Sequence, residues 1–273
     1  MHCSRLERVS PVVHCITNYV TVNDCANIIL AGGGRPVMAH HPGEAAQITA
    51  GSRALVLNMG TLHDTDSMLL AGKKSNELGH PVVLDPVGVG GSDLRQQTFR
   101  SLAQAVRFTV IRGNVSEIKY LATGAGGISG VDAADADRIT GENVSSAAEL
   151  ACSLAERLGC VAVISGSIDI VADARRVCFV QNGHPIMAKI TGSGCMSTAL
   201  IGAFLGACPE EPFEAALAAV AVMGVCGELA FAKTEAQQGG TMTFRTHLID
   251  QVSLLTADKL TRLARITRRK RNE

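Results

Sequence analysis

Short runs of consecutive apolar residues recur along the first part of the chain. The run at residues 81–85, Pro-Val-Val-Leu-Asp, does not alternate between apolar and polar positions, which is typical of a strand buried on both faces. The same pattern predicts further buried strands at residues 12–16, 54–58, 108–111 and 160–164.

Segments with helical periodicity separate these runs. Residues 64–78 predict a helix that ends at Gly79, because glycine readily adopts the left-handed conformation of a helix C-cap. A second helix is predicted to begin at a capping box formed by Ser146 and Glu149 and to end at Gly159. Four or more such units predict an α/β fold, with a doubly wound, mainly parallel sheet flanked by helices.

Beyond residue 165 the pattern changes to shorter apolar runs and then to helices. From Gly194 to about residue 268 helical periodicity dominates, and the basic residues 268–271 are expected to form a solvated, frayed end. No linker, repeat or low-complexity segment interrupts the chain, so residues 1–273 are predicted to form one domain. Three short strands joined by turns, one of which contains Asn182-Gly183, are expected at residues 168–172, 176–181 and 185–190.

The composition is that of a globular chain without net charge. Lys and Arg number 25, as do Asp and Glu, and charged residues make up 18% of the chain against 47% hydrophobic residues. These values exclude intrinsic disorder and remove the usual electrostatic argument for binding nucleic acid or an anionic membrane. Aromatic residues are 3% and Trp is absent, which also disfavours stacking on single-stranded nucleic acid.

Three features favour a cytoplasmic protein with a small-molecule ligand. The longest apolar stretches, such as residues 215–226, are shorter than the ~20 residues that span a bilayer. The opening Met-His-Cys-Ser-Arg lacks the pattern of a secretory signal. Nine scattered cysteines without a C-x-x-C pair indicate free thiols in a reducing compartment, rather than disulfides or a zinc site.

Polar residues follow several of the predicted strands, at the point where each strand ends. In open parallel sheets, ligands bind beyond the carboxyl ends of the strands, so these positions are expected to converge on one glycine-rich cleft. They are Asn58 and Gly60; Asp85, Pro86 and Gly88; Arg112, Gly113 and Asn114; Ser165 and Gly166; and residues 191–195.

The segment Thr-Gly-Ser-Gly-Cys at residues 191–195 is the strongest of these signals. Its glycines stand before a helix rich in Ala and Leu, where backbone N–H groups are able to hold a phosphate or a developing oxyanion. A tight turn that only lets the helix pack explains the same pattern, and the residues alone leave both explanations open. No Walker-type phosphate loop and no complete G-x-G-x-x-G occurs, and the glycines within residues 124–127 are expected in a loop without a ligand.

Asn114, Glu117, Asp85 and Arg112 form a second candidate group. Asn114 and Glu117 have the spacing of a capping box, which is a purely structural explanation for both. Asp85 ends a buried strand and precedes a proline, a position that packing explains poorly. With Glu117 it is suited to Mg²⁺, which prefers a few carboxylates together with water and phosphate, and Arg112 is suited to neutralise phosphate charge. Together these residues favour phosphoryl transfer.

Five motifs, in order over nearly the whole chain and at similar spacing, resemble the hydroxyethylthiazole kinase family. They are residues 11–18 (PVVHCITN), 36–39 (PVMA), 84–88 (LDPVG), 111–117 (IRGNVSE) and 191–195 (TGSGC). The resemblance implies a ribokinase-like three-layer sandwich and a homotrimer with active sites between subunits. It also implies a reaction of thiamine salvage, in which ATP with Mg²⁺ phosphorylates the hydroxyl of 4-methyl-5-(2-hydroxyethyl)thiazole.

The resemblance also assigns site residues by matching motif. The expected thiazole contacts are Asn18, Met38 and Gly192; the expected ATP contacts are Arg112, Asn114 and Ser165; and the expected magnesium ligands are Asp85 and Glu117. Ser165 replaces a threonine often found in the family and keeps its hydroxyl. The pair His40-His41 differs from the more varied loop expected there, and a solvated loop explains it better than metal ligation.

Cys195 and Gly194 are the expected catalytic residues. Ribokinase-like enzymes generally carry an aspartate at the position of Cys195, as the base for the accepting hydroxyl. A helix N-terminus lowers the pKa of a thiol, so Cys195 is expected to be a modest base. Phosphoryl transfer depends mainly on positioning and charge stabilisation. We therefore expect Cys195 to assist, while the anion hole at residues 192–195 and Mg²⁺ contribute most.

Three other functions are compatible with the residues. A kinase for hydroxymethylpyrimidine or another small alcohol would keep the phosphate and metal residues and differ near Asn18 and Met38. An ATP-dependent dehydratase of the same fold would bind ATP but act on a hydrated nicotinamide. A nucleotide-sensing scaffold would have no reason to carry Asp85, Arg112 and Cys195 together.

Overall fold

One large sheet organises the molecule. Within the residues that the computed structural model describes (2–63, 65–124, 139 and 143–271), nine strands pair in the order β2-β1-β3-β4-β5-β6-β7-β8-β9. The strands are β1 (Val12–Ile16), β2 (Arg35–Val37), β3 (Ala54–Asn58), β4 (Val82–Asp85), β5 (Val110–Asn114), β6 (Val161–Ser165), β7 (Asp169–Ala172), β8 (Arg176–Val180) and β9 (Ile266–Lys270).

The sheet is mainly parallel. Strands β1 to β6 pair in parallel with one another, whereas β7, β8 and β9 form an antiparallel extension at one edge. Strands β3 and β4 are buried along their whole length, which is the reason for their continuous apolar sequences. The predicted α/β class with a doubly wound, mainly parallel sheet is confirmed.

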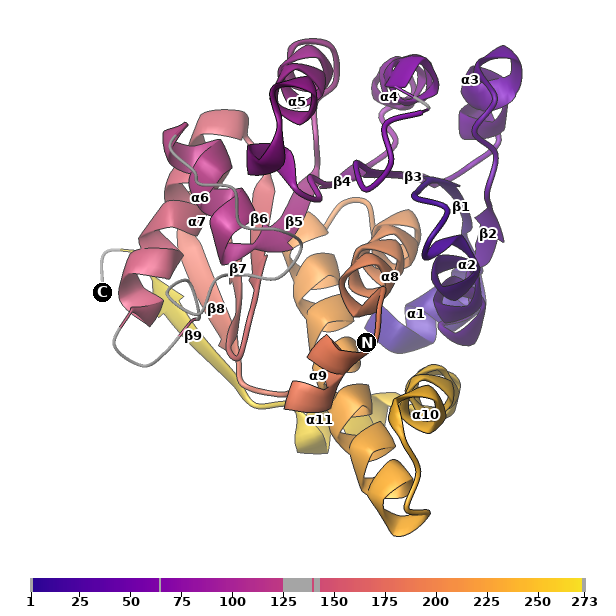
Figure 1. The fold of residues 1–273 in the computed structure, drawn as a ribbon, viewed down its shortest axis with the longest axis vertical. Helices are drawn as coiled ribbons and strands as arrows, with labels where there is room; N and C mark the ends of the chain where they lie inside the picture. The colour runs from indigo at the N-terminus through magenta and orange to yellow at the C-terminus, as the bar shows by residue number, and fades with distance from the viewer. Residues whose placement is uncertain (1, 64, 125–138, 140–142, 272–273) are drawn as a thin grey trace.

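Helices cover both faces of this sheet (Figure 1). One face carries α3 (Pro42–Ala50), α4 (Thr65–Glu77), α5 (Asp93–Ala105), α6 (Val115–Thr123) and α7 (Val144–Leu158). The other face carries α1 (His2–Val9), α2 (Val22–Ala31), α8 (Ser193–Ala207), α9 (Pro212–Ala236), α10 (Thr241–Leu254) and α11 (Ala257–Leu263).

Two apolar cores follow from this layering, one on each face of the sheet. Because successive side chains of a strand point to opposite faces, Val56 of β3 joins the core beneath α8 and α9, while Leu55 and Leu57 join the core beneath α4. All three side chains are almost completely buried. The fold is thus a three-layer sandwich, and predicted site residues such as Asp85 and Ser165 lie at the ends of its strands.

Glycines let helix α8 lie close to the sheet. A Cβ atom built on Gly202 would stand 2.4 Å from Val56 Cγ2, and one on Gly206 would stand 2.9 Å from Pro11 Cβ. Any larger residue at these positions would push the helix away from β3 and β1. Glycine therefore determines how near α8 comes to the strands.

The structure confirms most of the predicted elements. Strands β1 and β3 have the predicted bounds, and α4 ends before Gly79, which has a left-handed φ of +69°. Gly159 likewise ends α7 in the left-handed region, with φ +63°. Strand β5 covers residues 110–114 instead of 108–111, which moves Arg112 and Asn114 into the strand. Residue 64 and residues 125–127 of the expected glycine loop lie outside the described residues.

Three local predictions are wrong. Helix α7 begins at Val144, so Ser146 lies inside the helix and is not its cap. Residues Pro185–Lys189 form a short 3₁₀-helix instead of a strand, with the His184 side chain accepting a hydrogen bond from the N–H of Ile186. The basic tail is not frayed either, because Arg268 and its neighbours pair with β8 as strand β9.

The apolar stretch at residues 215–226 belongs to a longer helix than predicted. Among the described residues, α9 is the one helix long and apolar enough to cross a bilayer, which corrects the expectation that this stretch is too short. Of its most apolar 18-residue window, 72% is buried inside the fold. The apolar composition is therefore explained by the core between α8 and the sheet.

Candidate active site

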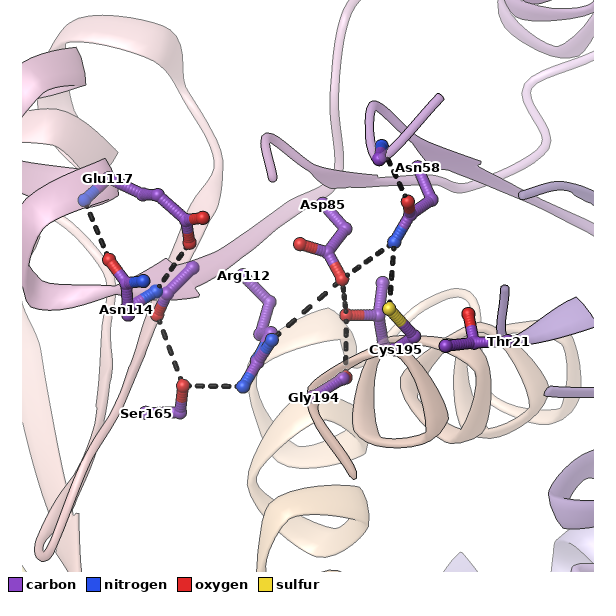
Figure 2. Close-up of polar contacts among 12 residues, drawn as sticks. Thr21, Asn58, Asp85, Arg112, Asn114, Glu117, Ser165, Gly194 and Cys195 are labelled. Atoms are coloured by element: carbon purple, nitrogen blue, oxygen red, sulfur yellow. Dashed lines mark hydrogen bonds and ion pairs between the residues drawn. The ribbon is translucent and has the colours of Figure 1, made fainter. Parts of the chain in front are cut away.

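The polar residues at the strand ends meet because neighbouring strands end at the same level. Asn58 of β3 stands opposite Asp85 of β4, and Asn114 of β5 stands opposite Ser165 of β6. The first turn of α8 faces this row, and Thr198 on α8 donates a hydrogen bond of 2.8 Å to Asp85 Oδ2. Figure 2 shows the resulting cluster, which joins β3, β4, β5, β6 and α8.

The glycines before and within the start of α8 are required by their surroundings. Gly192 has a left-handed φ of +86°, and a Cβ there would stand 2.8 Å from Thr21 Cγ2. A Cβ on Gly194 would stand 2.5 Å from Arg112 Nη1. The guanidinium of Arg112 therefore lies directly over the first turn of α8, where the helix dipole favours an anion.

Arg112 links the two halves of the cluster. Its Nη2 donates to Ser165 Oγ at 2.5 Å, and its Nη1 lies 3.8 Å from Asp85 Oδ2. Its Nε is buried and has no hydrogen-bond partner within the described part of the chain. A buried guanidinium N–H without an acceptor is costly, so this atom is suited to an anionic ligand.

Asp85 has one engaged and one unengaged oxygen. Oδ2 accepts hydrogen bonds from Asn58 Nδ2 at 3.0 Å and from Thr198, whereas Oδ1 is buried with no partner among the described residues. Burial raises the pKa of Asp85, and the charge of Arg112 opposes that rise. The unengaged oxygen is available for a cation or a proton.

Glu117 and Asn114 form the predicted capping box at the start of α6. The Asn114 side chain accepts from the N–H of Glu117, and Glu117 Oε2 accepts from the N–H of Asn114 at 2.8 Å. Glu117 Oε1 also accepts from the N–H of Gly88 at 2.9 Å. Burial raises the pKa of Glu117, and the charge of Asp85 raises it further. In Figure 2 this pair lies on the other side of Arg112 from Cys195.

Cys195 lies between two side-chain amides. Its sulfur accepts from Asn18 Nδ2 at 3.4 Å and from Asn58 Nδ2 at 3.3 Å. Burial raises the pKa of the Cys195 thiol, and the negative charge of Asp85 adds to this effect. Hydrogen bonds and Arg112 oppose the rise without reversing it, so the expected lowering by the helix N-terminus is outweighed.

Asn18 and Met38, the expected thiazole contacts, differ in their surroundings. Asn18 is buried, and its Oδ1 accepts from both the N–H and the hydroxyl of Thr21. Met38 follows β2, is half-buried and packs against the core on the α8 side of the sheet. The next residue, Ala39, is fixed through its carbonyl oxygen, which lies 2.7 Å from Nε2 of the buried His14.

The structure adds roles that the sequence patterns do not indicate. Thr21 forms a hydrogen bond with Asn18, and Thr198 forms one with Asp85. Asn58 forms hydrogen bonds with four groups of the cluster, whereas the sequence indicated only that it stands at a strand end. The sequence offered only the positions of these residues as a signal for their roles, because Asn58 ends a strand and the two threonines lie near the starts of helices. His41 is explained as well, because its side chain caps α3 by accepting from the N–H of Gly43.

Comparison with known proteins identifies the family. The family model described as "Hydroxyethylthiazole kinase family" matches residues 3–258. The chain belongs to the hydroxyethylthiazole kinase family. A hydroxyethylthiazole kinase of Clostridium acetobutylicum is 48% identical over 266 residues, which cover 96% of this chain and 97% of the relative. One of Desulfovibrio desulfuricans is 50% identical over 273 residues, covering 96% and 95%.

Solved structures agree with this family membership. The hydroxyethylthiazole kinase of Pyrococcus horikoshii superposes with a TM-score of 0.86 at 31% identity, covering 98% of this chain and 97% of that one. A pyridoxal kinase of Staphylococcus aureus shares the fold alone, with a TM-score of 0.57 at 15% identity, covering 80% of this chain and 87% of that one. These neighbours confirm the ribokinase-like fold of the chain, which as a member of its family is a phosphotransferase.

Proposed function

We propose that the chain transfers the terminal phosphoryl group of ATP to the hydroxyl of 4-methyl-5-(2-hydroxyethyl)thiazole, a step of thiamine salvage. In this reaction the bond between the terminal phosphorus and its bridging oxygen in ATP breaks. A new bond forms from that phosphorus to the alcohol oxygen, and the alcohol loses its proton. Family membership over residues 3–258 supports both the reaction and the acceptor.

The observation that carries the proposal is a pair of buried atoms without partners in one cluster, one a hydrogen-bond acceptor and the other a donor. Asp85 Oδ1 lacks a donor or cation, and Arg112 Nε lacks an acceptor, within the described residues. Both residues border the first turn of α8, where a side chain larger than that of Gly194 would collide with the Arg112 guanidinium. A phosphate with its cation would satisfy both atoms at once.

Asp85 and Glu117 are suited to Mg²⁺. Their carboxylates are hard oxygen donors, and Asp85 Oδ1 is unengaged. No group of three or more His, Cys, Asp or Glu side chains gathers as a metal cage within the part of the chain that the structure describes. This fits an ion held by one or two carboxylates together with phosphate oxygens. When bound, the ion would neutralise phosphate charge.

The remaining site residues receive the following proposed roles. Arg112 would bind phosphate oxygens, and its bond to Ser165 would keep the guanidinium in place. Gly192 and Gly194 would let the backbone of α8 approach the transferred group, and Met38 would contact the thiazole as a flexible thioether. Asn114 would orient Glu117 through the capping box, in addition to its predicted contact with ATP.

Cys195 would assist the transfer without being a strong base. Its thiol is kept largely protonated because burial and the neighbouring Asp85 raise its pKa. In a loose transition state the alcohol proton leaves late, so a weak hydrogen-bonding partner at the acceptor oxygen suffices. The charge of the transferred group would be stabilised mainly by Arg112 and the backbone of α8.

We further propose that residues 1–273 form one domain that assembles as a homotrimer in the cytoplasm. One continuous sheet supports the single domain, and the buried thiols of Cys15, Cys25 and Cys178, which form no disulfide, suit a reducing compartment. Tyr19 and Val20 directly before α2, Leu30 on α2 and Met242 on the adjoining α10 are exposed apolar side chains suited to a subunit contact. Sedimentation equilibrium tests the proposed homotrimer, and the mass of a monomer would contradict it.

Mass spectrometry of the products tests the reaction. The protein is incubated with ATP, Mg²⁺ and a panel of alcohols that includes the thiazole alcohol, hydroxymethylpyrimidine and pyridoxal. We expect a product heavier than the thiazole alcohol by one phosphoryl group, with ADP in equal amount. Phosphorylation of another alcohol alone would contradict the proposed acceptor. Release of phosphate with a hydrated nicotinamide cofactor, and no phosphorylated alcohol, would favour a dehydratase.

A further inference from the structure

Asn58 joins the two reactive side chains of the candidate site. Its Nδ2 donates one hydrogen bond to Asp85 Oδ2 at 3.0 Å and another to Cys195 Sγ at 3.3 Å (Figure 2). Asp85 is at the end of β4 and Cys195 is in the first turn of α8. One buried amide therefore connects the sheet to the helix at the point where the phosphoryl group is expected.

The orientation of this amide is fully determined. Asn58 Oδ1 accepts from the backbone N–H of Gly60 at 2.8 Å and from Asn18 Nδ2 at 2.9 Å. A rotated amide would place its NH₂ group against the N–H of Gly60 and its oxygen against the Asp85 carboxylate. All four hydrogen-bonding positions are used, and Asn58 is only 1% exposed.

Asn18 supports Asn58 from the other side. Its Nδ2 donates to Asn58 Oδ1 and to Cys195 Sγ, while its Oδ1 accepts from the N–H and the hydroxyl of Thr21, each at 3.1 Å. Asn18 is thus also saturated, and its predicted contact with the thiazole would require it to exchange one of these bonds. We call Asn18 and Asn58 together the amide pair.

We propose that Asn58, supported by Asn18, is a positioning residue for phosphoryl transfer, which holds the Asp85 carboxylate and the Cys195 sulfur in fixed relative positions. The inference rests on the proposed function. Because its polar atoms are engaged with protein groups, Asn58 acts through its neighbours and not by touching substrate. Its bond to Oδ2 also leaves Asp85 Oδ1 as the oxygen that faces a ligand.

Asn58→Leu tests this role by steady-state kinetics. Leucine has a similar volume but forms no hydrogen bond, so Asp85 and Cys195 lose their common anchor. We expect kcat to fall about 10²-fold, the cost of misplacing reacting groups by an ångström, while KM for ATP and for the alcohol changes little. In a Cys195→Ser background the same substitution should cost distinctly less, because part of its effect acts through the sulfur.

Asn182 provides a matched control. It is also a buried asparagine whose Nδ2 donates to a carboxylate, Glu228 Oε2 at 3.1 Å, and whose Oδ1 accepts a backbone N–H, that of Arg265. It follows β8, outside the cluster of Figure 2. Asn182→Leu should therefore lower the melting temperature as Asn58→Leu does, yet leave the kcat of the folded enzyme unchanged.

The hydrogen bond between Asn58 and Cys195 can be tested without substrate, through the reactivity of the Cys195 thiol. Asn58→Asp has the same shape and keeps both acceptor bonds, but it removes the donor from the Cys195 sulfur and from Asp85 Oδ2 and adds a second carboxylate beside both. Alkylation of Cys195 by iodoacetamide, followed by peptide mass spectrometry, should be slower than in the unmodified protein, because the thiolate is disfavoured. Asn182→Asp should leave this rate unchanged.

Two results would overturn the positioning role in an active enzyme. The first is a kcat of Asn58→Leu no lower than that of Asn182→Leu at equal folded fraction. The second is a rise in KM for the alcohol with kcat unchanged, which would make Asn58 a direct substrate contact. A chain that phosphorylates no alcohol in the panel would instead overturn the proposed function, and the positioning role with it.

Discussion

At the scale of single residues, the site is built from side chains that are almost all engaged. Asn18, Asn58 and Glu117 have hydrogen-bond partners at each polar end, whereas Asp85 Oδ1 and Arg112 Nε have none among the described residues. Buried polar groups are normally satisfied, so these two atoms, unsatisfied within one cluster, mark where a ligand belongs. Among these side chains, Asp85 Oδ1 and Arg112 Nε are therefore the atoms suited to contact a ligand.

Cys195→Ser is expected to lower kcat by roughly 10²-fold or less, because the thiol assists a proton transfer that is not rate-determining on its own. Cys195→Asp should preserve or raise kcat, since a carboxylate is ionised at neutral pH and is the commoner base in this geometry. Steady-state kinetics with saturating ATP measures both. Cys208→Ser, at the opposite end of α8, is the control for exchanging a thiol for a hydroxyl. A Cys195→Ser variant that binds ATP but is wholly inactive would refute the assisting role.

At the scale of elements, the first turn of α8 and the end of β5 are in close contact. The Arg112 side chain packs directly against Gly194, since a Cβ at position 194 would stand 2.5 Å from Nη1. Neither residue can change in size without moving the other. The phosphate-binding end of α8 therefore depends on a strand that is distant in sequence.

Gly194→Ala should weaken ATP use while leaving the fold intact. The added methyl group displaces the Arg112 guanidinium, so kcat/KM for ATP should fall roughly ten- to a hundredfold, as for loss of a hydrogen bond to a charged group. Gly240→Ala is the control, because a Cβ there meets nothing within 4 Å and its φ of −100° suits alanine. Equal kinetics for both variants would contradict the expectation.

Strand β9 is an element that stabilises the sheet edge without an apolar face. Its five side chains are exposed, yet its backbone pairs along the whole of β8. Deletion of residues 266–273 should lower the melting temperature and promote aggregation, because the edge of β8 is uncovered. Replacing Arg268 by Gln should change stability far less, because its ion pair with Glu214 is exposed and such pairs contribute ~0–1 kcal/mol. An unchanged melting temperature after the deletion would show that β9 is dispensable.

The predictions from sequence succeeded where burial determines the residue type. Strands β1, β3 and β4 were recognisable because both of their faces are buried, which demands consecutive apolar residues. Strand β9 carries no such signal, since Arg268 and its neighbours face solvent and its pairing depends on the edge that β8 offers. Asp85 and Arg112 were found by their place at strand ends, but the role of Asn58 depends on bonds to residues that only folding brings near.

At the scale of the whole molecule, stability depends on pH partly through His14. This side chain is fully buried between Thr49 Oγ1 and the carbonyl of Ala39, and burial lowers its pKa against the opposing effects of that carbonyl and Glu44. The folded protein therefore keeps the ring neutral. The unfolded chain takes up a proton below the ordinary pKa of about 6.5 and so binds more protons there.

The free energy of unfolding should consequently fall as the pH drops below about 6.5, with no contribution from His14 above it. The difference between the unmodified protein and His14→Gln isolates this effect from the buried carboxylates, whose raised pKa values act in the opposite direction. Urea unfolding at pH 7.5 and 5.5 measures it, with the exposed His63→Gln as control. A difference independent of pH would refute the assignment.

The close seating of α8 has a consequence for turnover. Gly202 stands two turns beyond Cys195, about 10 Å along the helix axis, and touches Val56 of β3. Asn58, two residues after Val56 on the same strand, bonds to the Cys195 sulfur. A single methyl group at position 202 would therefore move α8 away from β3. The hydrogen bond from Asn58 Nδ2 to Cys195 Sγ would then lengthen. An apparently inert position deep in the core thus governs the spacing of the reacting groups.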